Sequence, residues 1–240
     1  MQNINPTHTR NRRALFYLSV LGFPVLIGGC TAITSIALMT QFPVFGNSTT
    51  LAMVCLGLFS IPAIIGGGLA VYRGLTLEKD NPVAYEVGET LRSFLDDRYT
   101  FIRNVSRRKL GYIDAVLIGP PGALVFRTVD YSGTWRNERA EWKIKDRKGS
   151  MRSAPSNPSR ECARDVYALR DYFARRNLDK VPVYGIVVFH SQNLILQGAG
   201  QVVPIAETHR IYDVLVRDYL AEDSRISFDQ ARAAISAITE

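Results

Sequence analysis

The sequence predicts an α/β fold, more narrowly an α+β domain with a mixed sheet, preceded by a two-helix transmembrane hairpin. Three observations lead to this fold class. Two uncharged apolar stretches lie near the N-terminus, and the remaining sequence is rich in charged residues. In that remainder the spacing of apolar residues changes from helical to strand-like and back again. At 240 residues, the chain has room for one domain of ordinary size beside the hairpin.

The two apolar stretches predict transmembrane helices over residues 14–39 and 51–72. Neither contains a charged side chain, and each is longer than the roughly 20 residues that cross a hydrocarbon core. The connecting loop, residues 40–50, favours a turn because it contains Pro43, Gly46, Asn47 and Ser48. Glycines within the spans would allow the two helices to approach closely, namely Gly22, Gly28, Gly29 and Gly66 to Gly68.

Basic residues on both flanks of the hairpin predict its orientation. The connecting loop has no Lys or Arg, whereas the flanks carry Arg10, Arg12, Arg13, Arg73 and Lys79. Because positive residues stay on the cytoplasmic side, we expect a multi-pass protein of the cell (inner) membrane with both termini cytoplasmic. The tail (1–13) and the linker (73–81) then lie in the cytoplasm, as does the soluble domain (82–240).

The first span also has an alternative interpretation. Arg12-Arg13, an apolar run and then Gly28-Gly29-Cys30 resemble a lipoprotein signal with an acylated Cys30. The apolar run continues to Met39 without a polar tether, which favours the transmembrane helix. The other cysteines, Cys55 and Cys162, are scattered, so the sequence predicts neither a disulfide framework nor a structural zinc site.

The soluble domain begins with a helix and a β-meander. Val87, Leu91 and Phe94 recur at helical spacing within residues 81–97. Three strands of a meander are expected next, at residues 99–105, 111–118 and 123–129. A fourth, half-exposed strand is expected at 140–145, where Trp142 alternates with charged residues.

The second half of the domain predicts a long helix and a buried strand. Residues 146–159 are basic and rich in Ser, Pro and Gly, as in a loop, and residues 157–177 predict the helix. The nearly continuous apolar run over 183–189 predicts a strand in the middle of the sheet. The remaining elements are a strand at 201–205 and helices at 207–220 and 227–238, the last capped by Ser227.

Several short motifs in this order resemble a known family, the NERD or nuclease-related domain. The resemblance covers about residues 83–215. Its motifs are Gly88-Glu89, Tyr112-Ile113-Asp114, Gly122-Ala123-Leu124-Val125-Phe126, Asp130-Tyr131-Ser132-Gly133, Asn157-Pro158 and Gly185-Ile186-Val187-Val188-Phe189. The resemblance implies a restriction-endonuclease-like core of the PD-(D/E)xK type. In such cores a helix acid, a strand Asp and a Glu-x-Lys pair hold Mg²⁺ and activate the water that attacks a phosphodiester.

The site that the resemblance implies is degenerate in this chain. Glu89 matches the helix acid and Asp114 the strand Asp, but the Glu-x-Lys pair falls on Arg127 and Val129. Glu161 stands where the family usually has Gln. A guanidinium at the Glu position competes with a divalent cation for the same space. We therefore expect an inactive site without a cofactor, in which Arg127 forms a salt bridge with Asp114 or Glu89.

Three functions remain open from the sequence. The first is a catalytically inactive binding or scaffold module at the cytoplasmic membrane face. The second is a Mg²⁺-dependent nuclease with a rearranged site, with Glu89 and Asp114 as metal ligands, Glu161 beside them and Lys143 as a replacement lysine. The third is an adaptor whose sheet recognises a protein partner.

Three basic clusters contribute part of the net charge of +7 and predict a polyanionic partner. Anionic lipid headgroups and nucleic acid both fit. Lipid, or a plain solvated surface, is favoured over nucleic acid because no aromatic residues interleave with the middle cluster to form a base-stacking platform. The clusters comprise Arg103, Arg107, Arg108 and Lys109; Lys143, Lys145, Arg147, Lys148 and Arg152; and Arg175, Arg176 and Lys180.

Overall fold

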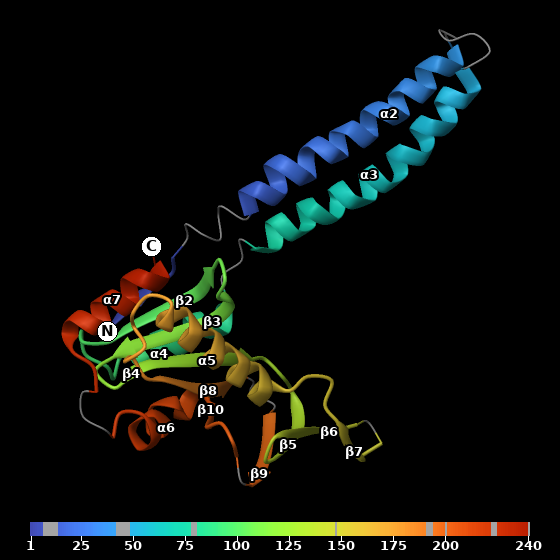
Figure 1. Ribbon diagram of the computed structural model, residues 1–240. Helices are drawn as coiled ribbons and strands as arrows, with labels where there is room; N and C mark the ends of the chain where they lie inside the picture. Colours follow the sequence, from blue (N-terminus) through green and yellow to red (C-terminus); the bar gives the residue numbers. More distant parts are fainter. Residues whose placement is uncertain are drawn as a thin grey trace. The chain divides into compact units, whose positions relative to one another are not determined.

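The computed structural model describes residues 1–6, 14–41, 49–77, 81–146, 148–190, 194–199, 201–221 and 225–239 (Figure 1). The chain forms two compact units. One is a helical hairpin within residues 7–79. The other is a soluble α/β domain that combines residues 1–6 with residues 80–240.

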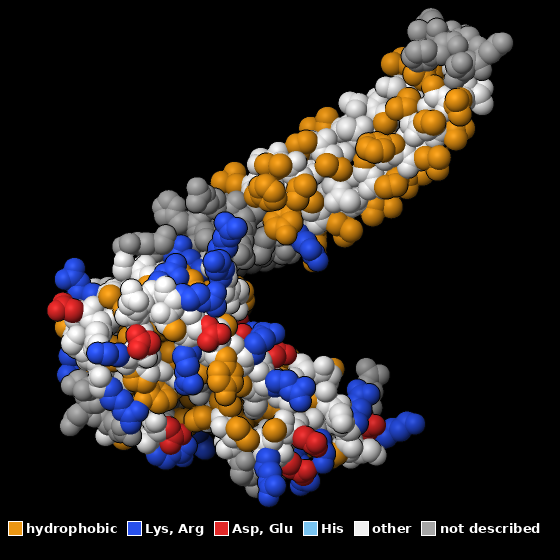
Figure 2. Space-filling view, in the orientation of Figure 1, with side chains coloured by type: hydrophobic (Ala, Val, Ile, Leu, Met, Phe, Trp, Pro, Cys, Tyr) orange, Lys and Arg blue, Asp and Glu red, His pale blue; other side chains and the backbone are white. Residues whose placement is uncertain are grey.

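The hairpin unit consists of two long antiparallel helices. A π-helical segment, η1 (Tyr17–Gly22), runs directly into α2 (Phe23–Gln41), and α3 spans Thr49–Leu77. Both are long and apolar enough to cross a membrane. Hydrophobic side chains cover much of their surface (Figure 2). The turn expected at Pro43 to Ser48 lies outside the described residues.

Glycines bring the two helices close at some positions but not at others. A Cβ at Gly67 would lie 2.7 Å from the Leu26 nitrogen, and one at Gly29 would lie 3.1 Å from the Ser60 carbonyl oxygen. The expected close approach is therefore confirmed there and at Gly22, where Val71 lies opposite. It is wrong for three glycines that face open space, Gly28, Gly66 and Gly68.

The soluble domain is built on a six-stranded mixed sheet in the order β1-β2-β3-β4-β8-β10 (Figure 1). Strands β2 to β4 form an antiparallel meander, and the other neighbouring pairs are parallel. The strands are β1 (Gln2–Ile4), β2 (Thr100–Arg107), β3 (Gly111–Gly119), β4 (Gly122–Val129), β8 (Val183–Phe189) and β10 (Ile205–Glu207). The mixed sheet and the central position of β8 confirm the predicted fold class.

Helices cover both faces of this sheet because its central strands are apolar on both sides. In β3, Leu117 packs into one hydrophobic cluster and Ile118 into the other, as alternation in a strand requires. Helices α4 (Pro82–Arg92) and α6 (Ile211–Asp218), the latter after η3 (Thr208–Arg210), pack on one face. Helices α5 (Pro158–Ala174) and α7 (Phe228–Thr239) pack on the other. Ser227 caps α7 as predicted, since the Gln230 N–H donates to its hydroxyl at 3.2 Å.

A second sheet, in the order β7-β6-β5-β9, is the largest departure from the sequence analysis. Its strands are β5 (Gly133–Glu138), β6 (Glu141–Lys145), β7 (Met151–Ser153) and β9 (Leu194–Ala199). Only β6 was expected. The loop predicted over 146–159 contains β7, and the strand predicted at 201–205 begins only at Ile205. Trp135 and Trp142 form the small core of this region with Val129 and Phe189.

The strand β1 precedes the hairpin and belongs to the soluble domain. The sequence analysis treated residues 1–13 as a tail, but Gln2–Ile4 pairs with Thr100–Ile102 of β2. The Asn3 side chain donates to Glu89 Oε1 at 2.8 Å and accepts from Arg103 Nε at 2.9 Å. The hairpin is therefore an insertion between two segments of one domain.

Candidate functional site

The site begins where β3 and β4 separate. The two strands pair from Gly119 and Gly122 as far as Ala115 and Phe126, and the ladder then ends. One residue further along β3, the Asp114 carboxylate accepts a hydrogen bond from the Thr128 N–H at 2.9 Å. A side chain thus takes the place of the missing backbone partner. This fixes a buried carboxylate between the two strands.

Arg127 connects this carboxylate to helix α5. Its Nη1 lies 3.3 Å from Asp114 Oδ2, and its Nη2 lies 2.5 Å from Glu161 Oε2. One guanidinium therefore bridges acids from a strand and a helix that are far apart in the sequence. The sequence predicted the salt bridge with Asp114, whereas the contact with Glu161 was not foreseen.

Helix α5 presents two acids towards Arg127. Asn157 caps the helix by accepting from the Arg160 N–H at 2.9 Å, and this places Glu161 in its first turn. Asp165 follows one turn later on the same face. Asp165 Oδ1 accepts from Arg164 Nη2 at 3.2 Å, while the buried Oδ2 has no hydrogen-bond partner among the described residues.

Burial and charge act in opposite directions on these groups. Burial raises the pKa of the Asp114 carboxyl, and Arg127 and the Thr128 N–H partly offset this. Burial likewise raises the pKa of Asp165, against the opposing effect of Arg164. Burial alone would lower the pKa of Arg127, but Asp114 and Glu161 outweigh it and the net change is upward. The surroundings therefore favour the charged form of Arg127, whereas burial disfavours the charged forms of Asp114 and Asp165.

Two residues predicted at the site have their partners elsewhere. Glu89 on α4 contacts Asn3 and lies 3.7 Å from Arg92 Nη1, rather than joining Arg127. Lys143 on β6 binds Glu138 Oε2 at 2.7 Å. Of the two partners expected for Arg127, the structure therefore has Asp114 and not Glu89, and Lys143 does not reach the cluster as a replacement lysine.

Val129, to which the resemblance assigns the position of the family's lysine, has an apolar environment. It packs with Trp135, Trp142 and Phe189 in the small hydrophobic cluster under the second sheet. Cys162, next to Glu161 in sequence, is also buried there, and burial raises the pKa of its thiol to about 12. The apolar cluster thus closes one side of the site.

The arrangement holds a guanidinium where a metal ion would be expected. Among residues outside the gaps in the described chain, no group of three His, Cys, Asp or Glu side chains is placed to hold a metal ion. Magnesium prefers oxygen ligands in octahedral geometry, and Arg127 already uses carboxylate oxygens of Asp114 and Glu161. The residues present therefore do not fit a bound Mg²⁺.

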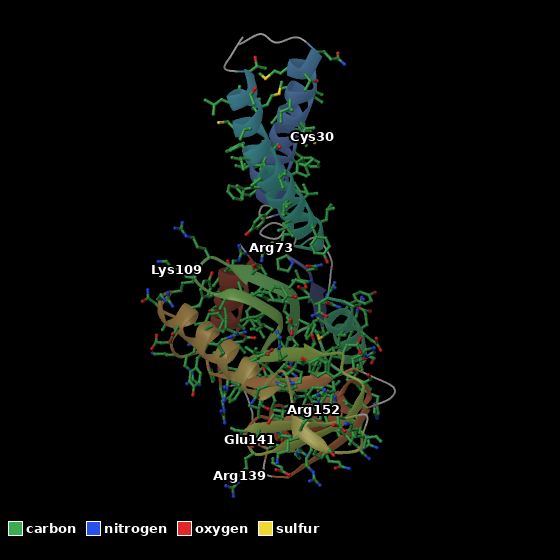
Figure 3. All side chains as sticks on the ribbon, turned by 90° about the vertical axis from the view of Figure 1, so that its right-hand side faces the viewer. Cys30, Arg73, Lys109, Arg139, Glu141 and Arg152 are labelled. Carbon is green, nitrogen blue, oxygen red and sulfur yellow. The ribbon has the colours of Figure 1, made fainter. Side chains whose placement is uncertain are left out.

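A polar cavity of about 460 Å³ lies beside Glu161. It opens between β6, β7 and the start of α5, so it is next to the cluster. Figure 3 shows Glu141 and Arg152 on these strands. The cavity is lined by Glu141, Trp142, Ser153, Ala154, Pro155, Ser156, Asn157, Arg160 and Glu161. Its hydroxyl, amide and guanidinium groups suit a polar ligand.

Together, the mixed sheet, Asp114 between β3 and β4, and Glu161 on the adjoining helix α5 indicate a nuclease-related class of domain. Comparison with family models agrees, because residues 79–190 match NERD, the nuclease-related domain. The matched region begins just after the apolar hairpin and resembles a NERD domain. No curated protein and no solved structure matches the chain in the corresponding comparisons.

Two features of this region were not predicted from the sequence, namely Asp165 and a neighbouring neutral cluster around Asn104. The spacing of Glu161 and Asp165 by four residues was a usable signal, since such residues share a helix face. Asn104 gave no local signal. Its role depends on Asn5 and Asn81, which come from distant parts of the chain.

Proposed function

We propose that this protein is a membrane-tethered nuclease-related domain that does not hydrolyse phosphodiesters. It acts instead as a binding or scaffold module at the cytoplasmic membrane face. One observation carries the proposal: the Arg127 guanidinium lies between the Asp114 and Glu161 carboxylates. Metal-dependent phosphodiester cleavage needs a divalent cation at such oxygens. Arg127 neutralises them with a group that offers no Lewis acid and no metal-bound water.

The membrane tether rests on the surface of the hairpin helices. In the most apolar stretch of each helix, only 11% and 17% of the residues are buried within the structure. Leu58 and Phe59 are each 72% exposed, which is unfavourable in water over so large an apolar surface. Contact of these apolar side chains with lipid tails would remove the free-energy cost of exposing them to water.

The pairing of β1 with β2 supports a common side for both ends of the hairpin. Residues 2–4 and 100–102 form one ladder, although they lie before and after the hairpin in the sequence. Two membrane crossings bring the chain back to the side from which it started. The Arg and Lys residues on both flanks favour the cytoplasm as that side.

A cleavage assay tests the catalytic part of this proposal. The full chain, purified in detergent, is incubated with single- and double-stranded DNA and RNA in the presence of Mg²⁺ or Mn²⁺. We expect no cleavage above that of an Asp114→Ala variant purified in the same way. Cleavage by the wild type that disappears in Asp114→Ala would show an active metal nuclease and overturn the proposal.

Metal binding tests the role of Arg127 directly. We expect the wild type to bind no Mn²⁺, as monitored by the electron paramagnetic resonance of the free ion. Arg127→Gln should bind Mn²⁺ because its carboxylates lose the cation that neutralises them. Arg136→Gln is the matched control, since Arg136 is an exposed partner of Glu138 on β5. Mn²⁺ binding by the wild type that Asp114→Ala abolishes would contradict the proposal.

A further inference from the structure

The chain segments before and after the hairpin both contact one buried side chain of the soluble domain, Asn104. Asn104 Nδ2 donates to Asn5 Oδ1 at 3.3 Å, and the Asn81 backbone N–H donates to Asn104 Oδ1 at 3.3 Å. The Tyr112 hydroxyl donates to the same oxygen at 3.1 Å. Asn5, Asn81, Asn104 and Tyr112 are called the Asn104 junction below. Asn5 is the last of these before the hairpin in sequence and Asn81 is the first after it.

The connection from this junction to α3 is short. Residues 78–80 separate Leu77, the end of α3, from Asn81. An extended chain covers at most about 3.6 Å per residue, so this connection spans no more than about 14 Å. If α3 crosses a bilayer, as proposed above, the junction end of the domain is held close to the lipid headgroups.

The same end of the domain carries exposed cations. Strand β2 continues from Asn104 to Arg107, and the turn into β3 contains Arg108 and Lys109, which are exposed and form no ion pair among the described residues. Tyr112 follows on β3 with 46% of its surface exposed. Tyrosine is enriched at the membrane–water interface because its ring is apolar and its hydroxyl polar.

The other basic residues near this turn are already used within the domain. Arg103 is only 7% exposed, binds Asn3 and lies over the Tyr85 ring at 4.9 Å. Arg107 Nε donates to the Ile238 carbonyl oxygen at 2.9 Å. The expectation that Arg103 and Arg107 bind a polyanion together with Arg108 and Lys109 is therefore narrowed to the last two.

We propose that the β2–β3 turn docks on anionic lipid headgroups through Arg108, Lys109 and Tyr112. This inference rests on the membrane tether proposed above. Nucleic acid offers the same phosphate chemistry, but the short connection between α3 and Asn81 keeps this end of the domain beside lipid at every moment. The charge complementarity and the tether thus favour the bilayer as the partner. Loss of both cations is expected to reduce docking by roughly thirtyfold, as two basic residues near an anionic surface would give.

The test uses the full chain in nanodiscs that contain an anionic lipid with a photoreactive headgroup. After illumination, mass spectrometry locates the cross-linked residues. We expect cross-links in the β2–β3 turn but not in the β5–β6 turn, which has a comparable backbone. Lys109 and Arg139 both have positive φ, 73° and 58°, and they lie at opposite ends of the soluble domain (Figure 3).

Charge variants complete the test. Arg108→Gln with Lys109→Gln is expected to lose most of the cross-linking, whereas Arg136→Gln with Arg139→Gln removes the same charge and should keep it. Equal labelling of both turns, or labelling unaffected by the first variant, would overturn the inference. So would displacement of the cross-links by an added RNA oligonucleotide, because that would identify nucleic acid as the partner.

A second label separates this inference from the proposal on which it rests. Lipids with a photoreactive group in the acyl chain should label α2 and α3 if the hairpin is inserted. Labelled helices with an unlabelled β2–β3 turn would contradict only the headgroup docking and would leave the membrane tether standing. Unlabelled helices would contradict the membrane tether itself.

Discussion

The Arg127 cluster and the Asn104 junction are neighbouring polar centres that are held together in different ways. The first consists of a guanidinium among the carboxylates of Asp114, Glu161 and Asp165. The second consists of neutral amides and a phenol. Thr128 connects them, because its N–H binds Asp114 and its hydroxyl accepts from Asn81 Nδ2 at 3.0 Å.

The difference shows which properties each centre can have. A charged cluster changes with pH and with competing cations, because each proton or ion alters the balance of charge. A neutral hydrogen-bond network has no such dependence and instead fixes geometry, since every donor and acceptor needs its partner. The first arrangement can respond to protons and ions, and the second suits a structural joint.

The largest expected effect is the loss of Arg127. Arg127→Ala should lower the free energy of unfolding by about 3 kcal/mol at neutral pH, because removing one partner of a partly buried ion pair leaves carboxylates without compensation. The two tryptophans of the chain, Trp135 and Trp142, both lie in the soluble domain. Denaturant unfolding followed by tryptophan fluorescence therefore measures this domain alone.

The matched control is Arg136→Ala, which removes an exposed ion pair with Glu138 and should cost less than about 1 kcal/mol. The Arg127→Ala loss should shrink in acid, because protonation relieves the repulsion between the remaining carboxylates. Equal losses for the two variants would show that charge does not hold the cluster together.

The neutral centre should respond to geometry and not to pH. Asn104→Ala is expected to cost about 2 kcal/mol, since alanine at the observed φ of 53° is strained and three hydrogen bonds are lost. Asn104→Gly relieves the backbone strain but not the lost bonds, so its cost should be smaller. Both costs should be constant across mildly acidic to neutral pH. If either cost depended markedly on pH, the Asn104 junction would not be the neutral, pH-independent centre described above.

Asp165 offers a smaller effect of opposite sign. Asp165→Asn should raise the free energy of unfolding by about 1 kcal/mol at neutral pH, because it removes a buried charge with an unpartnered oxygen. The pKa of Asp165 is raised in the folded state, so the folded domain binds this proton more tightly than the unfolded chain does. The wild type is therefore relatively more stable at acid pH, and that advantage is lost as pH rises through the raised pKa.

The gain in Asp165→Asn should accordingly disappear in acid, where Asp165 is protonated. Asp171→Asn on the exposed side of the same helix is the control and should change little at any pH. Destabilisation by Asp165→Asn at neutral pH would mean that the attraction between Asp165 and Arg127 outweighs the burial cost.

Cys162 gives the smallest effect and a local probe. Its thiol is buried, and a pKa of about 12 leaves almost no thiolate near neutral pH. Iodoacetamide should therefore leave Cys162 unmodified in the native wild type, as measured by mass spectrometry of the digested protein. Arg127→Ala should accelerate the modification through local opening, whereas Asn104→Gly should not. Rapid modification of the native wild type would contradict the closed apolar side of the site.

The sequence predicted those features that depend on local pattern. Strand β8 was predicted from residues 183–189 and has those bounds, because a continuous apolar run leaves few alternatives. The contact of Arg127 with Asp114 followed from motif order, since adjacent strands bring those positions together. The first helix was expected to reach Asp97 but ends at Arg92, where the spacing of apolar residues alone fixed no boundary.

Features that depend on distant pairing could not be predicted in the same way. Strand β5 is polar and pairs with β9, which lies about sixty residues later in the chain, so neither segment shows a strong pattern alone. Glu89 was assigned to the site because it lies on the first helix of the domain, α4, where the resemblance implies an acidic residue. Its partner Asn3 comes from β1, which is three residues long and carried no signal.

The position of β1 also affects how the protein is made. Ribosomes synthesise residues 2–4 before the hairpin, whereas the partner strand β2 emerges only after the whole hairpin has been produced. This edge of the sheet therefore forms only after both helices have been made, across a sequence separation that makes loop closure costly. A hairpin inserted with only one crossing would strand β1 on the opposite side of the bilayer and leave β2 with an open edge. If the hairpin spans a membrane as proposed above, completion of the sheet couples correct insertion to the folding of the soluble domain.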